Sequence, residues 1–173
     1  KKLITIGWIG SPSTTMYLNS ISNVFSEINR KYLGKINFVT IGAGKLKTKN
    51  DIIKNHNWSL DTEVKLLQSF DIGIMPLFND DWSKGKGGYK LLQYMSLGIP
   101  SIASPVGINC ELVQHGVNGY LAKDDKDWIE ILSKLIENDL LRKKIGNQAR
   151  IIAEQNYTFE INSEIIFDKI NKI

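Results

Sequence analysis

The amino-acid sequence predicts an α/β protein with a parallel β-sheet, helices on both faces of that sheet and a helical C-terminus. Short apolar runs alternate along the chain with segments whose apolar residues recur at helical spacing. The runs lack the polar alternation of a sheet with one solvated face, which indicates burial on both faces. The chain has 173 residues, of which 42% are hydrophobic and 23% charged. This length and composition suit one folded domain, expected over residues 1–173.

Four apolar runs predict strands. Residues 3–8 lead into a Gly-Ser-Pro loop, and residues 36–41 end at a Gly-Ala-Gly turn. Residues 71–76 end at a proline, which has no N–H for a sheet, and residues 100–104 follow a helix that stops at a glycine. The lysine-rich stretch 45–57 shows neither a strand nor a helix period and stays unassigned.

Six segments predict helices. In the first of them, Tyr17, Leu18, Ile21, Val24, Phe25 and Ile28 fall on one helical face. The third starts after a run of glycines and ends at Gly98, a common stop for a helix. The last two leave no strand signal at the C-terminal end. In chain order the predicted helical segments are 17–28, 61–70, 87–97, 128–136, 140–157 and 160–173.

The charge balance excludes some classes of partner. The net charge is only +4, with 22 basic against 18 acidic residues, and 19 of the basic residues are lysine. Because nucleic-acid binders usually carry a concentrated, arginine-containing stripe, we expect no nucleic-acid partner. Cys110 stands alone, and no apolar run reaches the length of a membrane span. We therefore expect a cytoplasmic protein with at most a weak, peripheral association with the anionic inner face of the membrane.

Parallel sheets bind ligands at the carboxyl ends of their strands, which here directs attention to the loops 7–14, 42–49 and 78–88. The third loop has glycines at 85, 87 and 88, with Lys86 and Lys90 beside the start of the next helix. Glycines and a helix N-terminus suit a diphosphate, although a solvated loop without a ligand stays an open alternative. The Gly-Ala-Gly turn lacks the third glycine of a dinucleotide fingerprint, which disfavours a nicotinamide oxidoreductase.

No metal site is predicted. Asp80 and Asp81 are adjacent, so on an extended loop their carboxylates diverge. His56 and His115 lack acidic or cysteine partners at ligand spacing. Cys110 is expected to be a small buried side chain, because most single cysteines are.

Five segments together resemble a known family. They are residues 6–10, 39–44, 71–77, 90–107 and 111–121. Their order and spacing are similar to those of the C-terminal, donor-binding domain of GT-B glycosyltransferases, in the retaining family called group 1 or family 4. The resemblance implies a Rossmann-like domain that forms one half of a GT-B fold, with an N-terminal acceptor-binding domain outside this chain. It also implies a nucleotide-diphosphate sugar as donor, no metal or other cofactor, and transfer of the glycosyl group to a glycan or lipid-linked acceptor in cell-surface polysaccharide synthesis.

The resemblance also assigns site residues. Two family glutamates, eight positions apart, correspond here to Gly85 and Gln93, so both carboxylates are missing. The basic residues that many members carry after the first strand are absent from 8–14, and Lys86 and Lys90 take their place as the expected catalytic residues. The expected nucleotide-sugar-binding residues are Gly10, Ser11, Gly42, Trp58, Ser59, Gly88, Tyr89 and Gln93. A non-catalytic nucleotide-binding module of the same fold is the alternative.

Overall fold

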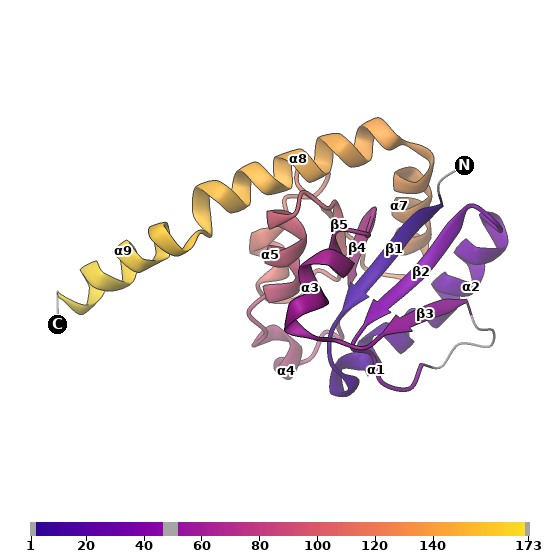
Figure 1. Ribbon diagram of the computed structural model, residues 1–173, viewed down its shortest axis with the longest axis horizontal. Helices are drawn as coiled ribbons and strands as arrows, with labels where there is room; N and C mark the ends of the chain where they lie inside the picture. Colours follow the sequence, from indigo (N-terminus) through magenta and orange to yellow (C-terminus); the bar gives the residue numbers. More distant parts are fainter. Residues whose placement is uncertain (1–2, 47–51, 172–173) are drawn as a thin grey trace.

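The computed structural model describes residues 3–46 and 52–171 and contains a parallel sheet with helices on both faces (Figure 1). The described residues form six strands in the order β3-β2-β1-β4-β5-β6, and every neighbouring pair is parallel. The strands are β1 (Ile4–Ile9), β2 (Ile36–Ile41), β3 (Ile53–His56), β4 (Ile72–Met75), β5 (Ser101–Ala103) and β6 (Tyr120–Leu121). The predicted fold class is therefore confirmed.

Helices cover the sheet in two layers. In the hydrophobic core, α1, α2 and α7 pack on one face, and α3, α5 and α6 pack on the other. The helices are η1 (Pro12–Thr14), α1 (Thr15–Ser20), α2 (Ser22–Lys31), α3 (Leu60–Leu67), α4 (Asp81–Lys84), α5 (Tyr89–Ser96), α6 (Asn109–Leu112), α7 (Asp125–Glu137), α8 (Asp139–Asn156) and α9 (Phe159–Ile170). The long helix α8 runs along the outside against α5 and α7.

Local sequence patterns predicted most elements, and the differences have physical reasons. The segment 17–28 is two helices, because the backbone at Ile21 leaves the helical region, yet all six residues of its predicted face are buried. Strand β3 lies in the unassigned stretch 45–57, of which 47–51 are outside the described residues. The predictions missed α4, α6 and β6, which are too short to show a period.

One prediction about a single side chain was wrong. Cys110 is exposed rather than buried. Val64 of α3 is also exposed, because only one stripe of that short helix meets the sheet. Trp128, in contrast, is a core residue of α7, with 2% of its surface exposed.

Glycines in the central strands let helices approach the sheet closely. A Cβ at Gly7 of β1 would overlap the Phe70 ring, and one at Gly73 of β4 would lie 2.6 Å from the Tyr94 ring. The hydroxyl of Tyr94 accepts a hydrogen bond from the Ile9 N–H (3.2 Å) and donates one to the Ile74 carbonyl oxygen (3.3 Å). Helix α5 is therefore tied to the ends of both strands.

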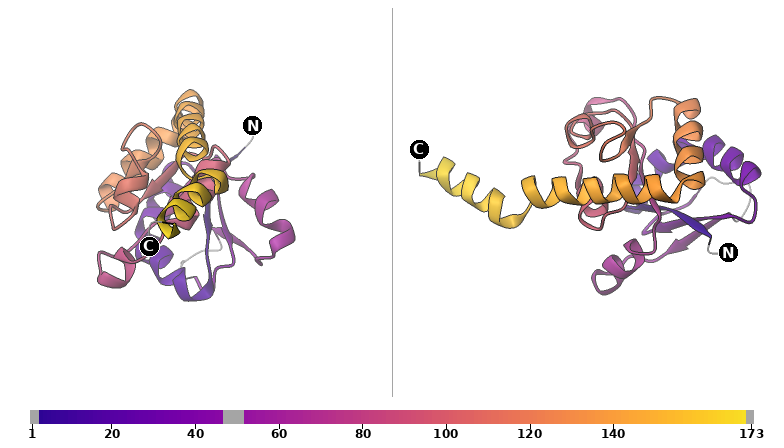
Figure 2. Two further views of the ribbon diagram at one scale, coloured as in Figure 1. Left: turned by 90° about the vertical axis from the view of Figure 1, so that its left-hand side faces the viewer. Right: turned by 90° about the horizontal axis from the view of Figure 1, so that it is seen from above.

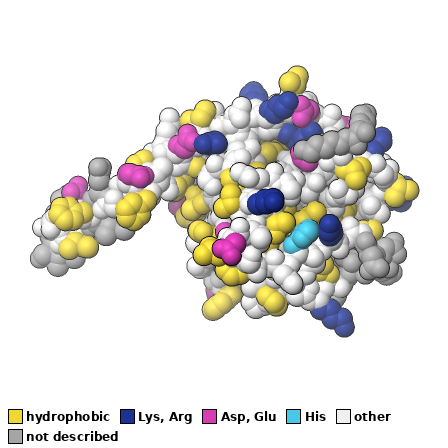
Figure 3. Space-filling model, viewed as in Figure 1, with side chains coloured by type: hydrophobic (Ala, Val, Ile, Leu, Met, Phe, Trp, Pro, Cys, Tyr) yellow, Lys and Arg dark blue, Asp and Glu magenta, His cyan; other side chains and the backbone are white. Residues whose placement is uncertain are grey.

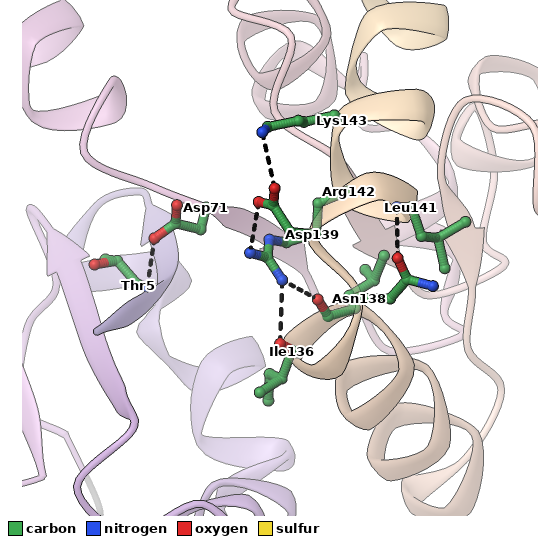
Figure 4. A network of polar contacts seen from close by, with 9 residues as sticks. Thr5, Asp71, Ile136, Asn138, Asp139, Leu141, Arg142 and Lys143 are labelled. Carbon is green, nitrogen blue, oxygen red and sulfur yellow. Dashed lines mark hydrogen bonds and ion pairs between the residues drawn. The ribbon is translucent and has the colours of Figure 1, made fainter. Parts of the chain in front are cut away.

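A polar network closes the amino edge of the sheet (Figure 4). The buried guanidinium of Arg142 donates to the carbonyl oxygens of Leu135 (2.5 Å) and Ile136 (3.1 Å), where α7 ends, and to Asp139 (3.1 Å). The Asp71 carboxylate accepts a hydrogen bond from the Thr5 N–H (2.8 Å), which joins β1 to the start of β4. These bonds satisfy the last carbonyl oxygens of α7 and the Thr5 N–H near the start of β1.

The C-terminal helix α9 extends away from the body of the domain (Figure 2). Its residues Phe159, Phe167 and Ile170 are exposed, and apolar side chains are visible along this extension in Figure 3. The same view shows lysine and arginine side chains dispersed over the face rather than gathered in a stripe. Within the described residues, no helix combines the length and apolar character that crossing a membrane requires.

Candidate functional site

A pocket of about 710 Å³ lies at the carboxyl edge of the sheet, opposite the Arg142 network. The strand order reverses between β1 and β4, so the loops after these strands lead to helices on opposite faces and leave a crevice between them. The pocket opens at this crevice. Its lining residues are Ile9, Gly10, Ser11, Pro12, Thr14, Gly42, Ala43, Asn57, Trp58, Glu63, Tyr89, Lys90 and Gln93.

The floor of the pocket is backbone that only glycine permits. The Gly10 N–H donates to the Ile41 carbonyl oxygen (3.0 Å), and the Gly42 N–H donates to that of His56 (2.8 Å). Gly42 has φ +72°, and a Cβ there would overlap the Gly10 carbonyl oxygen. Gly10 and Gly42 therefore shape the pocket by lacking side chains.

One wall is the N-terminus of α5. Gly88 precedes the helix in the left-handed region (φ +68°), and a Cβ there would overlap the side chain of Leu112. The helix therefore starts at a fixed point, with Tyr89 and Lys90 of its first turn on the pocket. The first-turn N–H groups and the positive end of the helix dipole favour an anion here.

Two lysines lie near this helix start. The Lys90 ammonium is 5.7 Å from the Trp8 ring centroid, and burial, together with the charge of Lys86, lowers the pKa of Lys90. The Lys86 ammonium lies 5.1 Å from the Tyr17 ring centroid and 5.8 Å from that of Trp82. Aromatic faces attract cations, but they leave the N–H donors of both groups available. Lys90 lines the pocket and Lys86 lies just outside its lining.

The opposite wall holds a polar group, Glu63, that no sequence motif indicated. The Glu63 carboxylate accepts a hydrogen bond from the Gln93 side-chain amide (2.6 Å) and another from the indole N–H of Trp58. Helices α3 and α5 are thereby joined across the pocket, while the Trp58 indole stays half-exposed. Glu63 lies in the predicted helical segment 61–70 and carried no predicted role in the site. The available signal was its position one turn into the helix that follows Trp58.

The pocket brings together seven of the ten predicted site residues. These are Gly10, Ser11, Gly42, Trp58, Tyr89, Lys90 and Gln93. Lys86, Gly88 and Ser59 are outside its lining: Gly88 sets the start of α5, and Ser59 is the N-cap residue of α3 and so helps to place Glu63. The binding and catalytic roles of all ten stay predictions.

The loop before α5 has structural roles for its acidic residues. Asp80 caps α4 by accepting a hydrogen bond from the Ser83 N–H (2.7 Å), and this bond lowers the pKa of Asp80. Gly85 ends the same helix with ordinary backbone angles, and a Cβ there would meet no atom closer than 3.6 Å. Packing therefore does not require glycine at this position.

Comparisons with known proteins agree with this fold. An archaeal relative, "Uncharacterized glycosyltransferase MJ1178" of Methanocaldococcus jannaschii, is 31% identical over 127 residues, which are 66% of this chain and 34% of the relative. The chain thus spans about a third of that relative's length.

Two solved structures share the fold. Anabaena Alr3699/HepE in complex with UDP and glucose matches with a TM-score of 0.79 and 18% identity, over 99% of this chain and 49% of that one. The C-terminal domain of a group 1 family glycosyl transferase (LpcC) from Francisella tularensis matches with a TM-score of 0.69 and 17% identity, over 90% and 87% of the two chains.

The family itself follows from the sequence match. The family model described as "Glycosyl transferases group 1" matches residues 2–138, well over half of the chain. The resemblance found in the sequence motifs is therefore confirmed, and the protein belongs to the group 1 glycosyltransferases.

Proposed function

We propose that this chain binds the donor for a retaining glycosyltransferase, holding a nucleotide-diphosphate sugar while its glycosyl group passes to a glycan or lipid-linked acceptor in cell-surface polysaccharide synthesis. The observation that carries the proposal is the pocket itself. It combines a half-exposed indole, Trp58, with a helix N-terminus and the Lys90 ammonium. A flat apolar ring suits a base, and the helix start with its lysine suits a diphosphate.

The chemistry of the transfer explains the value of this charge. As the bond between the anomeric carbon and the diphosphate oxygen breaks, positive charge grows on the sugar and negative charge on the departing oxygen. Lys90, Lys86 and the dipole of α5 stabilise that negative charge without providing a nucleophile. The acceptor-binding side belongs to the expected N-terminal domain, so the isolated chain should bind donor and transfer nothing.

The structural relatives support a sugar nucleotide as the donor. The HepE structure holds UDP and glucose, which makes UDP the first nucleotide to test on this chain. The proposal places the protein in the cytoplasm, where sugar nucleotides would reach this site directly. A weak association with anionic membranes is part of the proposal, and co-sedimentation with vesicles rich in anionic lipid tests it.

The decisive experiment measures transfer by the full-length enzyme. Lys86→Ala and Lys90→Ala should each abolish transfer while the thermal unfolding midpoint stays near that of the parent protein. Lys84→Ala is the matched control, because Lys84 is paired with Asp81 at 3.0 Å and does not line the pocket. Normal turnover in both variants would defeat the assignment.

One observation favours a second candidate, a nucleotide-binding module that does not catalyse transfer. Gly85 stands where the resemblance places one of the two family glutamates, although nothing in the packing requires glycine there. Thermal shifts separate the two candidates, since a ligand that binds the folded state raises the unfolding midpoint. A donor enzyme should be stabilised more by a sugar nucleotide than by the bare nucleotide, and a non-catalytic module equally by both.

We also propose that donor binding needs no metal ion, because two ammonium groups and a helix N-terminus supply positive charge for the diphosphate. Binding of UDP should be equally tight in EDTA and in Mg²⁺. Binding that EDTA removes and Mg²⁺ restores would contradict this proposal.

A further inference from the structure

Glu63 is a pocket carboxylate with spare capacity to accept hydrogen bonds. One of its oxygens accepts from Gln93 and the other from Trp58, and both donors are neutral. A carboxylate has about four acceptor positions, so about two stay open. Among residues 3–46 and 52–171, Glu63 takes part in no ion pair within 4.0 Å. The charge of Glu63 is therefore available to a ligand with hydroxyl donors.

The position of Glu63 matches the middle of a nucleoside diphosphate. Such a ligand has its base, ribose and phosphates in a fixed order. If the base lies on Trp58 and the phosphates lie at the start of α5, the ribose falls between them. Gln93 lies one helical turn after Lys90 on α5, and Glu63 is bonded to both Gln93 and Trp58. The Glu63 carboxylate therefore lies where the two ribose hydroxyls of such a ligand would be.

A carboxylate at the Glu63 position favours ligand hydroxyl groups over ligand phosphates. A carboxylate repels phosphate, but it accepts short, charge-assisted hydrogen bonds from hydroxyls. The Gln93 amide already donates one hydrogen to Glu63, so it acts mainly to orient the carboxylate. Glu63 lies in the first turn of α3, so the backbone at the start of that helix fixes its position beside Trp58.

We propose that Glu63 of α3 binds the ribose hydroxyls of the donor and makes the site selective for ribonucleotides over 2′-deoxyribonucleotides. The carboxylate that α5 lacks at Gln93 is thereby supplied from the neighbouring helix. The assignment rests on the proposed donor-binding function and adds a specificity-determining residue to it.

Titration calorimetry on the purified chain tests the assignment with UDP and 2′-deoxy-UDP, and with the GDP and ADP pairs. The wild type should bind the ribonucleotide about tenfold or more tightly than its deoxy analogue, the scale of one charge-assisted hydrogen bond. Glu63→Gln keeps the side-chain shape and should bring this ratio close to one, mainly by weakening the ribonucleotide. Asp61→Asn removes an exposed acid from the same helix outside the pocket lining and should keep the ratio.

A double variant moves the carboxylate to the other helix. Glu63→Gln combined with Gln93→Glu exchanges the two groups and should regain at least part of the ribose preference. A purely structural Glu63 would instead change both affinities together and leave their ratio unaltered. An unaltered ratio in Glu63→Gln, or a ratio near one in the exchanged variant or the wild type, overturns the assignment.

The experiment also separates this assignment from the proposed function. Equal binding of ribo- and deoxynucleotides by the wild type leaves donor binding intact and removes only the role of Glu63. If none of the three ribonucleoside diphosphates binds the wild type, the donor-binding proposal fails and the assignment fails with it.

Discussion

At the amino edge of the sheet, Arg142 donates to two backbone carbonyls and to Asp139, whereas at the carboxyl edge Lys90 lies over the ring of Trp8. Arg142 is buried, and Lys90 is partly buried. Their partners differ: the guanidinium is bonded to fixed oxygens, and among the described residues the ammonium has no carboxylate within 4.0 Å.

The Arg142 charge therefore stabilises the fold, whereas the Lys90 charge is available to a ligand. Buried polar groups are normally hydrogen-bonded, because an unsatisfied one costs folding free energy. Arg142 follows that rule, whereas partial burial and the neighbouring charge of Lys86 lower the pKa of Lys90. An anionic ligand at this site would stabilise the charged form of Lys90.

The largest effect is expected at the amino edge. Arg142→Ala leaves the carbonyl oxygens of Leu135 and Ile136 unsatisfied and removes a packed side chain. The free energy of unfolding should fall by about 2–3 kcal/mol in chemical denaturation. Nucleotide affinity, measured by calorimetry below the unfolding midpoint, should stay unchanged, and a large loss of affinity would contradict the separation of the two edges.

Lys90→Met should produce the opposite result. The methionine keeps the apolar contact with Trp8 and removes a desolvated charge, so the unfolding midpoint should be equal or higher. Affinity for UDP should weaken by about 2 kcal/mol, because one charge-assisted contact to the diphosphate is lost. A destabilised variant with normal affinity would show that Lys90 supports the fold instead.

Tyr94→Phe tests the connection between the core and the site. The substitution leaves the Ile9 N–H and the Ile74 carbonyl oxygen without their buried partner, so the free energy of unfolding should fall by about 1–2 kcal/mol. Tyr157→Phe, at a half-exposed tyrosine, is the control. Equal stability of the two variants would show that the Tyr94 hydroxyl contributes little.

The smallest effect is a proton uptake on binding. The pKa of Lys90 is lowered in the folded chain, so at alkaline pH part of the population has lost this proton. A bound diphosphate favours the charged form and raises the pKa again. Calorimetry at about pH 9.5 in two buffers of different ionisation enthalpy should therefore show proton uptake, which is absent in Lys90→Met. Equal uptake in both proteins would assign the proton to another group.

The same lowered pKa predicts how folding stability varies with pH. Between the folded and the unfolded pKa of Lys90, the unfolded chain binds more protons than the folded chain. The contribution of Lys90 to stability therefore rises as pH increases through that alkaline window, up to the unfolded value near 10.5.

Local patterns were sufficient for most of the fold and for part of the site. Residues 36–41 form β2 as predicted, and the six-residue apolar face of 17–28 is buried even though the helix breaks at Ile21. Glycine and lysine spacing also pointed to the start of α5. These features depend on neighbours within one or two turns of chain, so the sequence alone contains the necessary information.

The arrangement of the pocket depends on which elements become neighbours in space. The strand order places the ends of β1 and β2 between α3 and α5, and only then does Glu63 meet Gln93, 30 positions along the chain. Gly42 needs to be glycine because the Gly10 carbonyl lies against it, a contact that no local period encodes. The amino-acid pattern thus determined four of the six described strands, most of the helices and the position of the glycine- and lysine-rich loop before α5. Tertiary packing decided which side chains share the pocket, because strand order and close backbone contact are long-range properties of the chain.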